Sequence, residues 1–198
     1  MLVDTETLRR RLRETLPTGT GHPALAQGRR RAGVLLLLYE KDGRLHVLFT
    51  RRGINVQRHA GEISLPGGEL EPDDASALEA AIRETQEEIG VSVRKDQVLG
   101  RLGDVDIPVS NFLVTPFVVL LDEAPEPAPD GAEISEVIEL PVEELSNPSI
   151  LRQRTFVRES VSRKLWFYEH PRYTIWGATG RILKEFLELD ALQEWRAS

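Results

Sequence analysis

The chain contains no cysteine among its 198 residues, which excludes disulfides, thiolate metal sites and a cysteine nucleophile. Histidine is scarce, and its four copies lack the HxxxH or HxH spacing of a zinc site. Long apolar runs are also missing, since none approaches the roughly 20 residues of a membrane span. The opening "MLVDTETLRRRLRETL" mixes acids with arginines, unlike a signal peptide, so we expect a cytoplasmic protein without a membrane partner.

Positive charge is in deficit, with 25 Lys and Arg against 32 Asp and Glu and a net charge of −7. Nucleic acids attract basic faces, so we expect no nucleic-acid partner. All but four of the cations are arginine, however, the residue better suited to gripping phosphate at a local patch. The composition predicts one globular domain over 1–198, and the one protein partner considered is a second copy in a homodimer.

Local patterns predict helices and strands in alternation. Leucines every four residues after the capping candidates Asp4 and Thr5 predict an N-terminal helix, which a linker-like loop follows through residue 30. The segment 32–52 predicts a strand pair around an Asp42-Gly43 turn, with an alternating second strand over 45–50.

Further along the chain, Asp73 or Asp74 is expected to cap a helix that ends at Gly90. The remaining segments predict short strands over 97–122, a Pro-rich excursion over 123–133, a strand and short helix over 136–145, a strand pair over 155–170 and one closing helix over 178–196. Strands mixed with a few helices in this order predict a mixed α/β domain.

The helix over "IRETQEEIGV" carries an unusual cluster of acids. At about 100° per residue, Glu84, Glu87 and Glu88 form one stripe, separate from an apolar stripe that packs. A solvated surface is the ordinary meaning of a charge run. These acids, however, lack cations four residues away and follow a Pro66-Gly67-Gly68 loop, and hard divalent cations bind carboxylate and carbonyl oxygens. The pattern therefore predicts a divalent metal site.

The segment "GGELEPDDASALEAAIRETQEEIGV" resembles the Nudix box. Its second half matches every fixed position from Arg83 to Val91. Its first half departs, because the spacing from Gly68 to Arg83 is one residue longer than usual and Asp74 stands in the middle.

The same lengthening occurs in a subgroup that resembles coenzyme A pyrophosphatases, which has a second signature upstream. This chain reads "LFTRRGINVQRHAGEISLPGG" there. The matching positions are Thr50, Arg52, Gly61, Pro66, Gly67 and Gly68. Leu65 replaces a Phe and Gln57 replaces an Arg, while "SNFLVTPFV" and "YTIWGATGRIL" extend the resemblance downstream.

The resemblance implies a Nudix α/β/α sandwich with a mixed sheet over about 31–185 and extra N- and C-terminal helices. It implies a hydrolase that cleaves coenzyme A or acyl-CoA to 3′,5′-ADP and (acyl-)4′-phosphopantetheine. Glu84, Glu87, Glu88 and the Gly68 carbonyl would hold Mg²⁺ or Mn²⁺, and Arg83 would orient a glutamate in the catalytic set.

Other roles are less determined by the pattern. The base that activates water is Glu84, Glu133 or Glu136, and the last two also fit ordinary surface acids. The candidate substrate contacts are Thr50, Arg52, Arg58, His59 and Gly61. His59 fits a structural hydrogen bond equally well, and Trp166 and Trp176 fit packing better than an adenine platform.

Two alternatives remain open at this point. Gln57, where the signature has Arg, leaves open a hydrolase of another nucleoside diphosphate derivative: ADP-ribose, NADH or a dinucleoside polyphosphate. The other alternative is a catalytically inactive Nudix-like regulator that binds nucleotides. Such domains lose acids from the box, whereas this chain retains Arg83 and all three glutamates.

Overall fold

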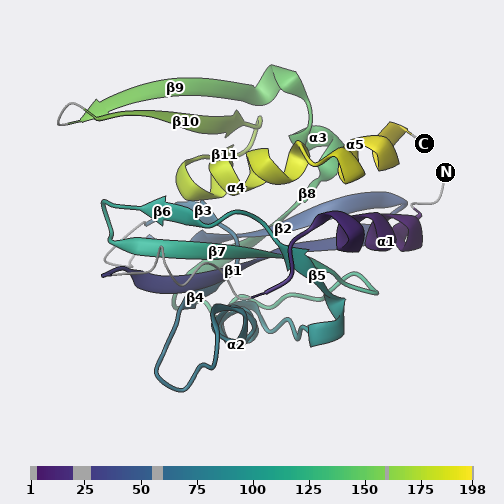
Figure 1. Cartoon of the computed structure of the whole chain (residues 1–198), viewed down its shortest axis with the longest axis horizontal. Coiled ribbons are helices and arrows are strands. Elements are labelled where there is room, and N and C mark those ends of the chain that lie inside the picture. Colours follow the sequence, from purple (N-terminus) through teal and green to yellow (C-terminus); the bar gives the residue numbers. More distant parts are fainter. Residues whose placement is uncertain (1–3, 20–27, 55–59, 159–160, 198) are drawn as a thin grey trace.

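The computed structural model describes residues 4–19, 28–54, 60–158 and 161–197, and its centre is a mixed eight-stranded sheet (Figure 1). The strands are β1 (Arg30–Lys41), β2 (Arg44–Arg52), β3 (Ile63–Ser64), β4 (Gly67–Glu69), β5 (Val98–Arg101), β6 (Val105–Ile107), β7 (Phe112–Leu120) and β8 (Ile134–Pro141). The order is β3-β2-β1-β7-β5, with β4 paired to β1, β6 to β7 and β8 to β2. β1 runs parallel to β7 and antiparallel to β2.

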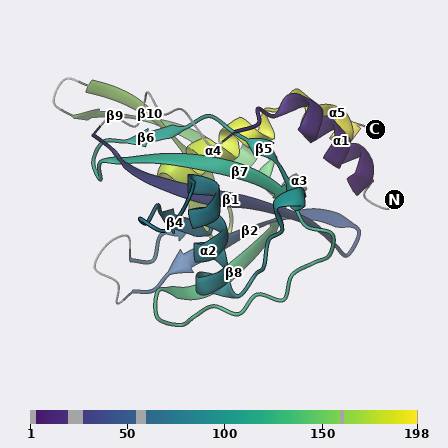
Figure 2. The same ribbon diagram turned by 60° about the horizontal axis from the view of Figure 1, so that its bottom comes forward.

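Helices cover both faces of this sheet (Figure 2). They are α1 (Thr5–Thr15), α2 (Ala77–Ile89), α3 (Val142–Leu145), α4 (Gly177–Leu187) and α5 (Asp190–Ala197). Leu35 and Leu37 of β1 pack in the core beneath α2, whereas Leu36 and Leu38 pack with α1, α4 and α5 on the other face. This division follows the two-residue period of a strand. The expected α/β/α sandwich with a mixed sheet and additional helices is confirmed.

The hairpin of β1 and β2 has the expected turn. Asp42 and Gly43 both have positive φ, 52° and 73°, as a two-residue turn between twisted strands requires. The expected alternation along β2 is wrong, because Leu45 through Thr50 are all buried. Elements pack on both faces of this strand, so even His46 and Thr50 lie inside.

Helix α2 begins later than its acids suggested. Ser76 caps it, with Oγ accepting from the Glu79 N–H at 3.3 Å. Asp74 instead accepts from the Glu71 N–H at 2.9 Å and belongs to the preceding loop. The helix ends at Gly90, whose φ of 70° is the left-handed conformation that glycine favours.

The N-terminal helix matches expectation, with Asp4 accepting from the Thr7 N–H at 3.0 Å. The prediction of a single closing helix is wrong. Helix α4 ends at Leu187, and a separate helix, α5, begins at Asp190 and lies beside α1 (Figure 1). Trp195 of α5 donates its indole N–H to the Asp4 carbonyl at 2.9 Å, so the break lets the two ends of the chain meet.

A second, three-stranded sheet extends beyond the body of the molecule (Figure 1). It comprises β9 (Leu151–Arg158), β10 (Val161–Glu169) and β11 (Thr174–Ile175), which confirms the predicted strand pair. The described residues also include two 3-10 turns, η2 (Lys95–Gln97) and η3 (Pro148–Ile150). Among the helices that the structure describes, none has the length and apolar character of a membrane span.

Candidate active site

Three glycines that precede α2 in the sequence allow β1, the loop before α2 and α2 itself to approach one another closely. A Cβ on Gly33 of β1 would lie 1.9 Å from the Ala77 carbonyl oxygen, so glycine lets α2 pack against the strand. Gly67 has a φ of 131° and lies against the backbone of Gly33. A Cβ on Gly68 would lie 2.6 Å from the Glu84 carboxyl carbon. The loop backbone therefore contacts an acidic side chain of α2 directly.

Glu88 is the buried acid of this site. Only 7% of the residue is exposed, and its Oε2 accepts from the Gly67 N–H at 3.1 Å. Burial raises the pKa of Glu88 to about 7, against the Gly67 hydrogen bond and the charge of Arg52, which both lower it; the charges of Glu84 and Glu133 also raise it, by less than burial does. The carboxylate is thus held in a place that disfavours its own negative charge.

Arg83 forms hydrogen bonds with three of the surrounding acids. Its Nε and Nη2 donate to Asp74 at 3.2 and 3.0 Å, and its Nη1 donates to Glu84 at 2.9 Å and Glu87 at 3.1 Å. The expectation that no cation lies four residues from these acids is therefore wrong for Glu87, whose partner is Arg83. Burial still raises the pKa of Glu84, against the effect of Arg83.

Arg52 and Glu133 approach the same site from the other side. Arg52 Nη2 and Glu133 Oε2 are 3.1 Å apart, and both charges act on Glu88. The Pro-rich excursion is tied to the end of α2, since the Asp130 N–H donates to the Glu88 carbonyl at 2.9 Å. Arg52 Nε is buried and has no hydrogen-bond partner within the described part of the chain. A donor left in this state is suited to an anionic ligand.

The two glutamates kept as candidate bases are separated by the fold. Glu133 lies near Glu84 and Glu88, as its effect on both pKa values shows. Glu136 instead pairs with Arg51 at 2.8 Å and accepts from the Tyr173 hydroxyl at 3.0 Å. Only the three-dimensional pairing of β8 with β2 could have told them apart.

The remaining predicted substrate contacts have different settings. Thr50 is fully buried and its hydroxyl bonds Ser64 of β3, an arrangement that positions the strand rather than a ligand. Gly61 has a φ of 73° and donates its N–H to the Arg52 carbonyl at 3.1 Å. Arg58 and His59 lie outside the described residues. Their roles as substrate contacts stay predictions.

The donor set of this site suits a divalent cation. Among the described residues, no three His, Asp or Glu side chains are already arranged closely enough to coordinate a metal ion. Glu84 and Glu88 are nevertheless both desolvated, both have raised pKa values and both adjoin the glycine-loop backbone. Carboxylates and a backbone carbonyl are the oxygen ligands of hard divalent ions, so the residues present fit such an ion.

Comparison with known sequences places this geometry in a family. The model of the NUDIX domain matches residues 29–161. A protein described as uncharacterized Nudix hydrolase NudL from Photorhabdus laumondii is 32% identical over 164 residues, covering 83% of this chain and 87% of its own. The NudL of Citrobacter koseri is 32% identical over 157 residues, covering 79% and 81%.

Solved structures share the fold. A MutT/nudix family protein from Enterococcus faecalis has a TM-score of 0.54 at 17% identity, covering 99% of this chain and 80% of its own. The NUDIX domain of Shewanella oneidensis NrtR, solved with ADP ribose, has a TM-score of 0.50 at 19% identity, covering 62% and 79%. Together with the sequence matches, the acidic helix and its glycine loop show that the chain belongs to the Nudix hydrolases, enzymes that generally use divalent metal ions to cleave pyrophosphate bonds of nucleoside diphosphate derivatives.

Proposed function

We propose that the protein is a Mg²⁺- or Mn²⁺-dependent pyrophosphohydrolase of coenzyme A or acyl-CoA. The observation that carries the proposal is the buried Glu88 carboxylate, which lies with Glu84 against the Gly67-Gly68 backbone. Burying like charges without compensation costs free energy. A divalent cation would neutralise the repulsion between these carboxylates and bind to them favourably, so the arrangement supports a metal site.

In this proposal Glu84, Glu87, Glu88 and the Gly68 carbonyl hold the ion. A bound divalent ion supplies charge neutralisation at the diphosphate and lowers the pKa of a water molecule. Arg83 keeps the carboxylate of Glu84 in one orientation, because a guanidinium fork fixes direction as well as charge.

The reaction adds one water across the diphosphate. Its oxygen bonds to one phosphorus, the bridging P–O bond breaks, and the products are 3′,5′-ADP and (acyl-)4′-phosphopantetheine. In this proposal Glu133 accepts the proton of that water, and its support is that the charge of Glu133 acts on both Glu84 and Glu88. In this proposal Arg52 binds a phosphate oxygen, which is supported by its buried Nε having no hydrogen-bond partner among the described residues.

The coenzyme A assignment draws on the segment "LFTRRGINVQRHAGEISLPGG" and the lengthened box. The structure adds support in one respect, because Arg52 from this segment pairs with Glu133 and its charge acts on Glu88. The second candidate is ADP-ribose or another nucleoside diphosphate derivative. It is favoured by the ADP ribose complex of the NrtR domain and by Gln57 at the position of an Arg.

A metal-dependent hydrolysis screen over a nucleotide panel tests the proposal. We expect turnover of coenzyme A with Mg²⁺ or Mn²⁺ and none with the ions chelated. The matched comparison is 3′-dephospho-coenzyme A, which retains the diphosphate, and equal kcat/KM for both would contradict the coenzyme A assignment. A panel without any turnover would support an inactive nucleotide-binding regulator instead.

A further inference from the structure

A cavity of about 420 Å³ opens at the end of β2, between the residues leading into β3 and the turn that joins β10 to β11. The lining residues that matter here are Arg51, Gly61, Glu62, Arg172, Tyr173 and Trp176. None of the acids of α2 lines it, so it is separate from the metal-binding candidates. Its volume is that of an ordinary small-molecule site.

Two guanidinium groups lie over the Tyr173 ring in this cavity. The Cζ atoms of Arg51 and Arg172 are 5.2 and 5.3 Å from the ring centroid. Arg51 is paired with Glu136, whereas Arg172 has no carboxylate partner within the described ranges. Arg172 therefore keeps its donors for an anion, and arginine binds phosphate through two parallel hydrogen bonds.

Trp176 gives the cavity an aromatic surface. One of its faces stacks on Phe167, with ring centroids 5.7 Å apart and planes within 5°. The residue is still 39% exposed, so the packing role expected from the sequence accounts for only part of the ring. Large aromatic side chains are mostly buried, and an exposed ring backed by another ring is suited to stacking with a nucleobase.

The cavity and the acidic site lie on opposite faces of the same strand end. Arg51 and Arg52 are consecutive on β2, so their side chains leave opposite faces. Arg52 contacts Glu133 at the acidic site, and Arg51 lies over Tyr173 in the cavity. The two sites therefore adjoin at the end of β2. A substrate whose diphosphate binds at Arg52 can extend around this strand end into the cavity.

We propose that the cavity binds the phosphorylated nucleoside end of the substrate. The base stacks on Trp176 and a ribose phosphate binds Arg172 and Arg51. The inference rests on the proposed coenzyme A activity, because coenzyme A has a ribose phosphate in addition to its diphosphate.

Fluorescence of Trp176 tests binding without turnover. The chain has three tryptophans, so the variant Trp166→Phe/Trp195→Phe leaves Trp176 as the reporter. We expect adenosine 3′,5′-bisphosphate to quench it saturably, and Arg172→Ala in this background to raise Kd roughly tenfold through loss of a charge-assisted contact. Unchanged emission, or equal Kd with and without Arg172, would overturn the proposal.

Kinetics of the full-length enzyme give a second readout. We expect Arg172→Ala and Trp176→Ala each to raise the KM for coenzyme A roughly tenfold with kcat retained, the size of a lost phosphate contact or stacked base. Trp176→Phe, which keeps a ring, should recover part of the loss. Arg154→Ala is the matched control, because Arg154 lies over Phe167 in the same aromatic stack and outside the cavity lining.

The outcomes separate the cavity from the activity. Quenching that depends on Arg172, without coenzyme A hydrolysis, would support a nucleotide site and overturn the proposed function. Coenzyme A hydrolysis with KM unchanged in both variants would support the function and overturn the cavity assignment.

Discussion

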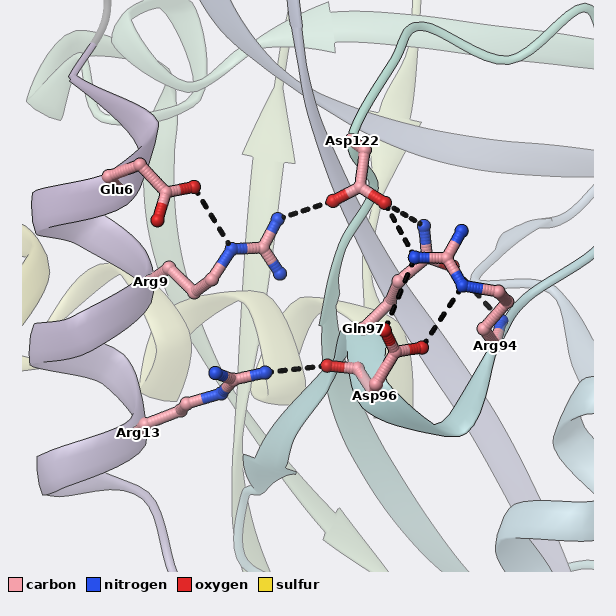
Figure 3. Close-up of polar contacts among 7 residues, drawn as sticks. All are labelled: Glu6, Arg9, Arg13, Arg94, Asp96, Gln97 and Asp122. Carbon is pink, nitrogen blue, oxygen red and sulfur yellow. Dashed lines mark hydrogen bonds and ion pairs between the residues drawn. The ribbon is translucent and has the colours of Figure 1, made fainter.

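Two clusters of arginine and acid in this molecule have opposite electrostatic outcomes. In the first, which we name the Asp122 network, Asp122 accepts from Arg9 and Arg94, both at 2.8 Å, and from Gln97 at 3.0 Å (Figure 3). Hydrogen bonds from Arg94 lower the pKa of Asp122 and of Asp96. The second is the acidic cluster of Glu84, Glu87, Glu88 and Glu133, in which burial raises the pKa of Glu84 and Glu88.

The difference lies in burial and in the balance of charge, since both clusters use the same residue types. Asp122 has two guanidinium partners and a half-exposed side chain, so its charge is satisfied. In the acidic cluster, Arg83 and Arg52 share their contacts among more acids than they can neutralise. A balanced cluster ties elements together, whereas an unbalanced buried one is suited to binding a cation.

Glu88→Gln removes the buried charge and should have the largest effect. We expect kcat to fall by roughly 10³-fold, because a metal ligand supports several kcal/mol of charge stabilisation in the transition state. The metal-free variant should be at least as stable as the parent at pH 8, where the parent's carboxylate is ionised against its raised pKa. Steady-state kinetics and thermal unfolding with EDTA measure both. Full activity would contradict the metal assignment.

Much of the scaffold could be predicted from local sequence. The Asp42-Gly43 turn and the end of α2 at Gly90 follow from backbone preferences that act within a few residues. The start of α2 was missed because Asp74, a good capping residue, bonds to the loop and Arg83 instead. Ser76 with Glu79 three residues later was the available signal.

Glu133→Gln tests whether the acidic cluster includes the base. We expect kcat to fall about 10²-fold with little change in metal affinity, the usual contribution of a general base. Glu136→Gln is the matched control, since Glu136 binds Arg51 and Tyr173 instead, and its kcat should stay within about threefold. The reverse order would assign the base to Glu136. Equal, small effects would leave Glu84 as the base.

Long-range placement is what local sequence could not give. Glu133 and Glu136 are both glutamates and lie three residues apart, so the local sequence does not distinguish them. Only the pairing of β8 with β2 shows that they face different surroundings. The break between α4 and α5 has no glycine or proline to mark it. It is explained by packing, because α5 contacts α1 through Trp195 and Asp4 at the far end of the sequence.

Arg83→Lys keeps the positive charge beside the acidic cluster but removes the planar guanidinium with its several fixed donors. Lysine cannot hold Asp74, Glu84 and Glu87 in fixed directions at once. We expect the metal concentration for half-maximal rate to rise about 10- to 100-fold, as when a group supporting metal ligands is lost. Arg94→Lys in the Asp122 network is the matched control and should leave that concentration unchanged. Identical metal dependence in both variants would show that Arg83 supplies charge alone.

Asp122→Asn should have the smallest effect, confined to stability. Each exposed ion pair contributes about 1 kcal/mol or less, so we expect a loss of roughly 1 kcal/mol in the free energy of unfolding at neutral pH. Because the pKa of Asp122 is lowered in the folded state, this contribution is present above the unfolded pKa and disappears as pH falls through the folded one. Urea unfolding at pH 7 and in acid, with and without 1 M salt, measures it. The kcat and KM should match the parent; a tenfold fall in kcat would mean that the balanced network also serves the site, and the distinction between the two clusters would fail.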